Sequence, residues 1–236
     1  KGSVGGKVVL VTGGSSGIGL AAACKFAEAG AITIICARGE DKLKEAVAEI
    51  HAHVAAMGGK NAQVFSYSVD IADEAGCAEF VKTLEEKHGG VDFLINNAGR
   101  SIRRAIENSY DRFHDFQRTM DLNYFGCLRV TMGLLPGMVK KRKGHVVNIS
   151  SIGVLTNAPR FSAYVASKSA LDAWTRCASS EFADQGISFT TINMPLVRTP
   201  MIAPTKIYNN VPTLAPEEAA DMIAQACVYK PVRIAT

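Results

Sequence analysis

The sequence predicts a single α/β domain in which a parallel β-sheet is covered by helices on both faces. Short runs of apolar and β-branched residues recur along the chain, separated by longer amphipathic stretches. These runs lack the alternation of apolar and polar residues that a half-exposed strand shows, so we expect both faces of the sheet to be buried. The chain has 236 residues, of which 47% are hydrophobic, and this suits one large core of the doubly wound kind.

Composition excludes several other classes of protein. Charged residues make up 20% of the chain and no repeat or low-complexity tract occurs, which excludes a disordered or collagen-like chain. No stretch approaches the roughly 18 uninterrupted apolar residues of a membrane span, and no signal peptide opens the sequence, so we expect a cytoplasmic protein without a transmembrane segment. The net charge of +4 is dispersed, which argues against nucleic-acid binding. The six cysteines form no CxxC pair and no histidine cluster joins them, so no metal site is expected.

The first part of the chain alternates strands and helices. Residues 7–12 (Lys-Val-Val-Leu-Val-Thr) form a buried-strand run, and a glycine-rich turn then leads into a helix that Gly30 ends. Residues 31–36 (Ala-Ile-Thr-Ile-Ile-Cys) are the second such run. The stretch 40–57 is amphipathic and is closed by Gly58-Gly59, as expected of a helix.

The same alternation continues to the end of the chain. The remaining strands are apolar or β-branched runs, expected at residues 64–68, 91–95, 145–149, 187–193 and 232–235. The remaining helices are the longer amphipathic stretches, expected at residues 73–88, 109–116, 120–140, 162–185 and 216–229. Ligands of such sheets bind at the carboxyl ends of the strands, so the residues that follow each strand are the candidate site.

The first strand is followed by the turn Thr12-Gly-Gly-Ser-Ser-Gly-Ile-Gly19, which leads straight into a helix. Free N–H groups and the positive end of the helix dipole at such a turn suit a pyrophosphate. Gly13 would permit the tight turn, Gly17 the approach of backbone to phosphate, and Gly19 the packing of helix on strand. The spacing in this context favours a dinucleotide site over an ordinary glycine-rich loop.

The second strand is followed by Ala37 and Arg38, where an NAD site usually has an acidic residue. A guanidinium can fork onto a 2′-phosphate and stack on adenine, and Ser15 and Ser16 could donate to the same phosphate. This favours NADP over NAD. The alternative is that Arg38 is a solvated loop residue.

Candidate cofactor contacts also follow the third and fourth strands. Asp70 could accept a hydrogen bond from the adenine amine, and Ile71 could cover the ring. The small residues Ala98 and Gly99 would let a cofactor cross the sheet edge, and the asparagine pair that ends at Asn97 could tie adjacent strand ends together.

A tyrosine and a lysine follow the fifth strand, which ends at Ser151. Tyr164 and Lys168 are four residues apart, so they lie on one face of a helix. An ammonium beside a phenol lowers the pKa of the phenol, and a serine at the facing strand end can hold a substrate oxygen. Such a pair is more often structural when it occurs alone, but after a dinucleotide turn it indicates acid/base chemistry on a carbonyl.

Together these residues resemble the short-chain dehydrogenase/reductase family. The matching motifs are Thr12-Gly-x-x-x-Gly-Ile-Gly19, Asn96-Asn-Ala-Gly99, Asn123, Ser151 and Tyr164-x-x-x-Lys168. The resemblance runs from end to end and implies a single Rossmann-type domain over residues 1–236, with a seven-stranded sheet in the order 3-2-1-4-5-6-7 and a nicotinamide cofactor over its carboxyl edge.

The resemblance also implies roles for the matching residues. Tyr164 would be the acid/base, Lys168 would bind the nicotinamide ribose and tune Tyr164, Ser151 would polarise the carbonyl, and Asn123 would hold a water in the proton relay. In family members, copies commonly pair through helices that correspond to 120–140 and 162–185, giving dimers or tetramers. The residues expected at the cofactor are Gly13, Ser15, Ser16, Gly17, Ile18, Gly19, Arg38, Asp70, Ile71, Asn97, Ala98, Gly99, Tyr164, Lys168, Val197 and Thr199.

A narrower resemblance concerns the substrate. Four segments, 97–105, 110–116, 160–168 and 194–206, are similar to bacterial fatty acyl-CoA reductases, which implies NADPH-dependent reduction of a long-chain acyl-CoA to the fatty aldehyde. Met194-Pro195 stands where most family members have Pro-Gly, so the hydrogen bonds of that loop do not transfer. Some such reductases are fused to a second reductase domain, which would suit a chain that starts at Lys1.

Two features near the expected site bear on an acyl-CoA substrate. Residues 200–215 are predicted to form a lid, with apolar surface enough to cover an acyl chain; the alternative is an ordinary loop. Several cations flank the substrate side, where some could bind the CoA phosphates or each could be a solvated charge: Arg100, Arg103, Arg104, Arg160, Arg198 and Lys206.

Two other functions stay open at this point. The same catalytic residues would serve the reduction of a 3-oxoacyl thioester, a ketone or a fatty aldehyde to an alcohol. A non-catalytic NADP-binding module is the remote alternative, which the intact Tyr–Lys pair disfavours.

Overall fold

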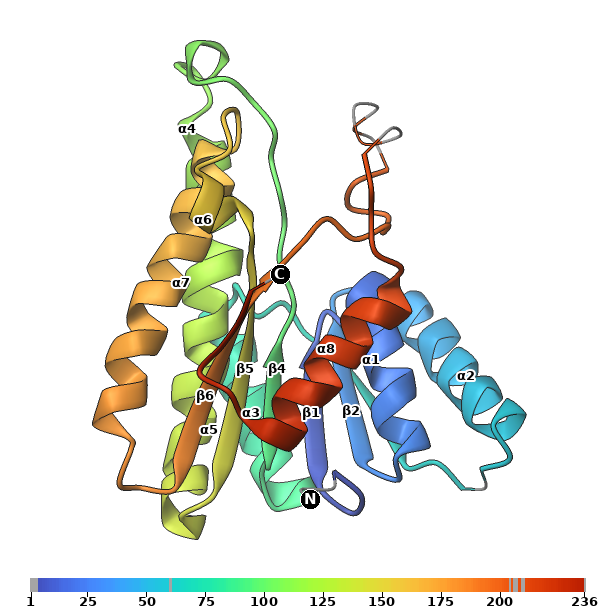
Figure 1. The fold of residues 1–236 in the computed structure, drawn as a ribbon. Coiled ribbons are helices and arrows are strands. Elements are labelled where there is room, and N and C mark those ends of the chain that lie inside the picture. The colour runs from blue at the N-terminus through green and yellow to red at the C-terminus, as the bar shows by residue number, and fades with distance from the viewer. Residues whose placement is uncertain (1–3, 60, 204, 206–207, 209–210, 236) are drawn as a thin grey trace.

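A computed structural model describes residues 4–59, 61–203, 205, 208 and 211–235. Its centre is a seven-stranded sheet in the order β3-β2-β1-β4-β5-β6-β7, and every strand pair is parallel (Figure 1). The predicted fold class and strand order are thus confirmed. The strands are β1 (Val8–Thr12), β2 (Ile32–Ala37), β3 (Val64–Ser68), β4 (Phe93–Asn96), β5 (Gly144–Ser151), β6 (Ile187–Met194) and β7 (Arg233–Ala235).

Helices cover both faces of the sheet. Helices α1, α2 and α8 pack on one face, and α3, α5 and α7 on the other (Figure 1). The helices are α1 (Gly17–Glu28), α2 (Glu40–Ala56), α3 (Glu74–His88), α4 (Phe113–Met120), α5 (Cys127–Lys141), α6 (Gly153–Thr156), α7 (Ser162–Glu181) and α8 (Pro216–Tyr229).

The absence of alternation in the central strands has a direct structural cause. Val9 and Val11 of β1 face the core beneath α1, α2 and α8, whereas Leu10 between them faces the opposite core. All three side chains are fully buried. Since each face of β1 is covered, alternate residues on both sides must be apolar. The edge strand β3 differs, because Phe65, Ser66 and Ser68 are exposed.

One prediction for the helices is wrong. The helix expected at 109–116 begins only at Phe113, after a short 3-10 turn at Ile106–Asn108. From there α4 runs through a π-helical turn at Asp121–Gly126 directly into α5, so the chain does not break near residue 120. A π turn takes up one extra residue within a helix, and no particular residue type marks it, so the sequence does not reveal it.

Buried asparagines join the middle of the sheet, as the sequence suggests for its strand ends. Asn96 Nδ2 of β4 donates to Asn148 Oδ1 of β5 at 2.8 Å and to Thr131 Oγ1 of α5 at 2.9 Å. Asn148 Nδ2 in turn donates to Thr175 Oγ1 of α7 at 2.8 Å. These bonds tie two central strands to the helices that pack behind them.

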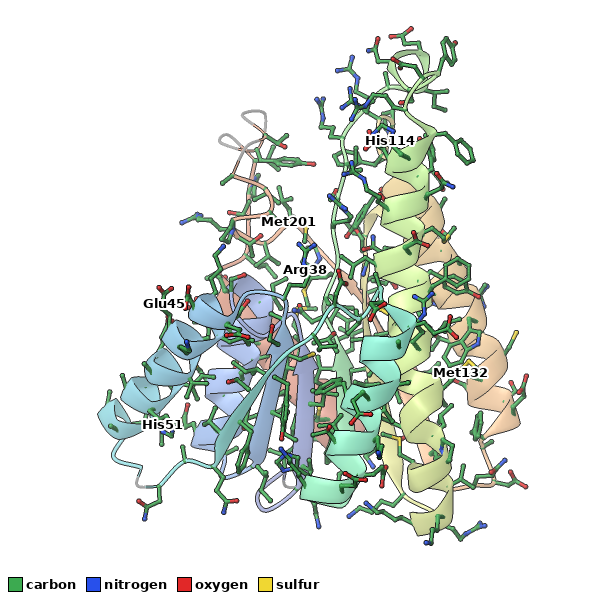
Figure 2. The ribbon with its side chains drawn as sticks, turned by 180° about the vertical axis from the view of Figure 1, so that it is seen from behind. Arg38, Glu45, His51, His114, Met132 and Met201 are labelled. Carbon is green, nitrogen blue, oxygen red and sulfur yellow. The ribbon has the colours of Figure 1, made fainter. Side chains whose placement is uncertain are left out.

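Two segments rise beyond the carboxyl edge of the sheet and stand on either side of it. Residues 97–112 climb from β4 to the start of α4, and the described residues between 195 and 215 climb from β6 before α8 begins (Figure 1). We call them the α4 arm and the β6 arm. In Figure 2, the side chain of Met201 extends from the β6 arm toward the space between the arms, and Arg38 lies below it, above the sheet. Among the described residues, no helix is long and apolar enough to cross a membrane, and no cluster of three metal-ligating side chains occurs.

Candidate active site

A cavity of about 500 Å³ opens at the carboxyl edge of the sheet, between the two arms. It is lined by residues that follow six of the seven strands. Of the residues predicted for the site, Gly19 and Asn123 do not line the cavity. Those that do are Gly13, Ser15, Ser16, Gly17, Ile18, Arg38, Asp70, Ile71, Asn97, Ala98, Gly99, Ser151, Tyr164, Lys168, Val197 and Thr199.

The glycine-rich turn between β1 and α1 forms one end of the cavity. Gly13 has φ +66° and Gly17 has φ +55°, in the left-handed region that favours glycine. A Cβ atom on Gly13 would lie 2.9 Å from Ala98 Cα, so the turn closes tightly against the end of β4. A Cβ on Gly19 would lie 2.3 Å from the carbonyl oxygen of Gly13, which places Gly19 behind the turn as a packing residue. The result is a narrow backbone cradle at a helix N-terminus, which fits a pyrophosphate.

Arg38 lies at the same end of the cavity, directly after β2. Its side chain is exposed and lines the cavity, and its carbonyl oxygen accepts a hydrogen bond from Ser68 Oγ at 3.0 Å. Ala37 precedes it, so no carboxylate lies at the end of β2. Asp70, after β3, accepts a hydrogen bond from the backbone N–H of Ala72 at 3.0 Å through Oδ1.

Thr12 organises the end of β4, a role that the sequence analysis missed. Its hydroxyl accepts hydrogen bonds from the backbone N–H of Asn97 at 3.1 Å and of Ala98 at 3.0 Å. Asn97 Nδ2 donates to the carbonyl oxygen of Thr12 at 3.0 Å. The two strand ends are therefore tied as predicted. Thr12 is the first residue of the glycine motif, and this position was the sequence feature that could have indicated its role.

Ser151, Tyr164 and Lys168 come together at the other end of the cavity. Tyr164 and Lys168 lie one turn apart on α7, and Tyr164 is hydrogen-bonded to Ser151 at the end of β5. Ser151 Oγ also accepts from the backbone N–H of Gly153 at 3.0 Å, which orients the hydroxyl. Lys168 is 3% exposed, and its Nζ donates to the carbonyl oxygen of Ile149 at 2.7 Å.

Burial dominates the protonation of this group. It raises the pKa of Tyr164, and the hydrogen bond with Ser151 lowers that pKa only in part. Burial also lowers the pKa of Lys168. The sequence predicts a lowered pKa for Tyr164. The structure differs because desolvation of the phenolate is the largest effect on Tyr164 and outweighs the hydrogen bond with Ser151.

Asn123 lies in the π turn, in the wall behind Lys168. Its Oδ1 accepts from the backbone N–H of Arg100 at 2.8 Å, and its Nδ2 donates to the carbonyl oxygen of Arg100 at 2.9 Å and to Ser167 Oγ at 3.0 Å. A Cβ on Gly99 would lie 3.2 Å from Asn123 Oδ1. The amide thus fixes the start of the α4 arm.

The β6 arm supplies apolar side chains to the cavity. Its base is held by two hydrogen bonds, from Arg198 N–H to the carbonyl oxygen of Leu214 at 2.9 Å and from Leu214 N–H to that of Leu196 at 2.9 Å. Above this base, the side chains of Met201, Ile202 and Tyr208 line the cavity. Pro204, Lys206 and Ile207 of the predicted lid lie outside the described residues.

The cations of the substrate side separate into two groups. Arg100 and Arg103 line the cavity, whereas Arg104, Arg160 and Arg198 do not. Arg104 lies beside Asp115, a buried carboxylate that the sequence analysis missed. The spacing Arg112-x-x-Asp115-x-x-Arg118, which puts three charges on one helix face, was a signal for it.

Comparison with known proteins gives relatives over almost the whole chain. The family model described as short chain dehydrogenase matches residues 7–208. The fatty acyl-CoA reductase of Acinetobacter baylyi is 56% identical over 234 residues, which cover 99% of this chain and 77% of that protein. A fatty acyl-CoA reductase of Mycobacterium tuberculosis is 45% identical over 231 residues, covering 98% of this chain and 76% of that protein.

Two solved structures share the fold at lower identity. A variant of actinorhodin polyketide ketoreductase with NADPH has a TM-score of 0.84 at 28% identity, covering 94% of this chain and 90% of that one. L-Sorbose reductase from Gluconobacter frateurii, in complex with NADPH and L-sorbose, has a TM-score of 0.83 at 27% identity, covering 95% of this chain and 90% of that one. With the strand order and the residues gathered at the carboxyl edge, these matches show that the chain is an oxidoreductase that belongs to the short-chain dehydrogenase/reductase family.

Proposed function

We propose that this chain is a single reductase domain that uses NADPH to reduce a fatty acyl-CoA thioester to the fatty aldehyde. The observation that carries the proposal is that one cavity is lined both by the glycine-rich cradle with Arg38 and by Ser151, Tyr164 and Lys168. The two fatty acyl-CoA reductases at 56% and 45% identity support the substrate class.

NADPH is preferred over NADH because of the residues after β2. Arg38 would bind the 2′-phosphate through its guanidinium, and Ser15 and Ser16 would donate to the same group. Position 37 is an alanine, so it offers no carboxylate to accept a hydrogen bond from the 2′-hydroxyl of NADH. The N–H groups at the start of α1 would hold the pyrophosphate, Asp70 and Ile71 the adenine, and Lys168 the nicotinamide ribose. Both structural relatives above were solved with NADPH, which supports the same preference.

The reaction has two steps, reduction of the thioester and breakdown of the resulting hemithioacetal. When bound, the nicotinamide supplies a hydride to the acyl carbon. Ser151 and Tyr164 donate hydrogen bonds to the carbonyl oxygen as charge develops on it, and Tyr164 transfers its proton to that oxygen. The product is a hemithioacetal. Its C–S bond then breaks, the hydroxyl proton leaves, and the thiolate takes up a proton, so that aldehyde and free CoA are released.

A product assay tests this function. The protein is incubated with NADPH and palmitoyl-CoA, and aldehyde and free thiol are quantified with a carbonyl and a thiol reagent. The proposal expects one thiol and one aldehyde for each NADPH oxidised. If palmitoyl-CoA supports no NADPH oxidation but a 3-oxoacyl thioester or a fatty aldehyde does, the result would instead support the alternative that the names of the two structural relatives suggest, namely reduction of a ketone or another carbonyl to an alcohol.

Three further features of the protein are proposed. The β6 arm is proposed to act as a lid over the acyl chain. Copies are proposed to pair through α5 and α7 as a dimer or tetramer. The chain is also proposed to be part of a longer protein that contains a second reductase domain.

A further inference from the structure

We propose that Arg103 binds a phosphate of the CoA moiety and thereby selects CoA thioesters over neutral thioesters. The inference rests on the proposed function for its substrate class. It concerns a residue of the α4 arm that the catalytic chemistry does not use, and it is carried by the different surroundings of the cations near the cavity.

The cation next in sequence to Arg103 is already bound within the protein. Arg104 Nε lies 3.6 Å from Asp115 Oδ2, and its backbone N–H donates to the carbonyl oxygen of Arg160 at 2.7 Å. Asp115 is 4% exposed, and Arg112 Nε donates to it at 2.9 Å. Burial favours the neutral acid, but hydrogen bonds from Arg112 and Arg118 outweigh it and lower the pKa of Asp115 to about 2. The carboxylate therefore stays charged and holds Arg104 in the wall of the arm.

Arg103 has the opposite character. Its side chain is exposed and lines the cavity, and within the described part of the chain it has no hydrogen-bond or ion-pair partner. Tyr208 of the β6 arm lines the same cavity, and burial raises its pKa whereas the charge of Arg103 lowers it. The guanidinium thus lies toward the β6 arm, where the two arms frame the opening. An exposed guanidinium at this opening can form charge-assisted hydrogen bonds with a phosphate.

The geometry of a CoA thioester favours Arg103 over the other cations. Its carbonyl must reach Tyr164 while its phosphates lie at the far end of the long pantetheine arm, so they stay near the opening. Arg100 also lines the cavity, but its backbone is bound by Asn123 beside Lys168, at the catalytic end. Arg198 Nη2 is 3.4 Å from Thr213 Oγ1, away from the cavity.

A binding experiment tests the inference without turnover. Free CoA is titrated by calorimetry into protein saturated with NADP⁺, so that the adenosine phosphates of CoA do not enter the cofactor site. One lost charge-assisted contact predicts about tenfold weaker CoA binding in Arg103→Ala. Arg103→Lys keeps the charge and should recover part of the loss. Arg198→Ala, the matched cation on the other arm, should bind within about twofold of wild type. A change below twofold in Arg103→Ala, or CoA binding that NADP⁺ abolishes, would overturn the inference.

A kinetic comparison separates this inference from the proposed function. The same acyl group is offered on CoA and on N-acetylcysteamine, a thiol without phosphates. Arg103→Ala should raise KM about tenfold for the CoA thioester alone, with kcat little changed. Equal effects on both thioesters would reject a phosphate-specific role while leaving the reductase intact. The wild-type protein could reduce neither thioester while the Arg103→Ala variant still binds CoA more weakly than wild type. That result would support the phosphate site and reject the proposed reaction.

Discussion

Lys168 Nζ donates a hydrogen bond to the carbonyl oxygen of Ile149, two residues before Ser151 on β5. The bond links α7 to β5 and holds the ammonium in the wall of the cavity that Ser151 and Tyr164 also line. A lysine held in this way is positioned before any ligand binds. The arrangement also explains why Lys168 affects Tyr164 less than the sequence suggests, since the ammonium is shared with a backbone dipole and its charge is opposed by burial.

The first prediction concerns the pH dependence of reduction. Tyr164 must be protonated to donate to the substrate oxygen, and burial raises its pKa above the ordinary value of 10.0. A raised pKa keeps the phenol protonated to higher pH, so kcat should stay flat between about pH 7 and about pH 9 and fall only in stronger alkali. The rate of NADPH oxidation at saturating substrate measures this. A decline with a midpoint near neutral pH would mean that the phenol is acidified instead.

Replacing Tyr164 by phenylalanine should remove the proton donor while leaving the ring. We expect kcat to fall by a factor of about 10³, in the range of a lost general acid. The Kd of NADPH, measured by fluorescence, should change by less than about twofold, because the ring is kept and only the hydroxyl is lost. Retention of full activity would remove Tyr164 from the mechanism.

The cofactor preference gives a second kind of prediction. Arg38→Ala should lower kcat/KM for NADPH by a factor of about 10 to 100, because a charge-assisted contact with the 2′-phosphate is lost. The value for NADH should not fall, since NADH has no such phosphate. Lys44→Ala, which removes an exposed cation of α2, is the matched control and should alter neither value. If kcat/KM fell equally with NADPH and NADH, Arg38 would not be the residue that binds the 2′-phosphate.

The sequence predicted the fold well where apolar runs and glycine turns decide it. The third strand has the predicted bounds, residues 64–68, and the other strands differ by one or two residues at their ends. The start of α4 was missed because Arg112 and its neighbours form turns stabilised by specific hydrogen bonds, not by a periodic apolar face. The π turn around Asn123 was also missed, and the hydrogen bonds of Asn123 go to Arg100 and Ser167, which are distant in the sequence.

The candidate site was predictable where a motif names the residue. Long-range partners were not, because a side chain that binds a distant backbone leaves no local pattern. Thr12 bonds across to Asn97 and Ala98, more than eighty residues away. The direction of the Tyr164 pKa also depends on how much of the phenol is buried, which only the packed structure sets.

Asp115 gives a prediction about the α4 arm. Asp115→Asn keeps the shape of the side chain but leaves Arg104, Arg112 and Arg118 around a neutral amide. We expect a lower melting temperature. We also expect a higher KM for the CoA thioester with a smaller change in kcat, because an α4 arm that is no longer fixed through Arg104 holds the neighbouring Arg103 less firmly at the opening. Asp111→Asn, a change of the same chemistry on an exposed residue of the arm, serves as the control. Unchanged melting temperature and KM would show that the carboxylate does not hold the arm.

His145 gives the last prediction, about stability rather than activity. It is fully buried in β5, and its Nδ1 lies 2.8 Å from Ser188 Oγ. Burial, aided by the charge of Lys230, lowers the pKa of His145 from 6.5 to about 4. Below pH 6.5 the unfolded chain binds a proton at this ring and the folded protein does not, so stability falls as the pH drops toward 4.

The expected loss from this one ring is about 2 kcal/mol of unfolding free energy between pH 7 and pH 5. Urea unfolding at the two pH values measures it. His145→Gln, which keeps a hydrogen-bonding side chain but does not titrate, should be less stable at pH 7 yet lose about 2 kcal/mol less on acidification than wild type. His51→Gln, on the exposed side of α2, is the matched control and should keep the wild-type pH dependence. If His145→Gln and wild type lose the same stability, the ring is already protonated in the folded protein at pH 5 and its burial does not set the acid sensitivity.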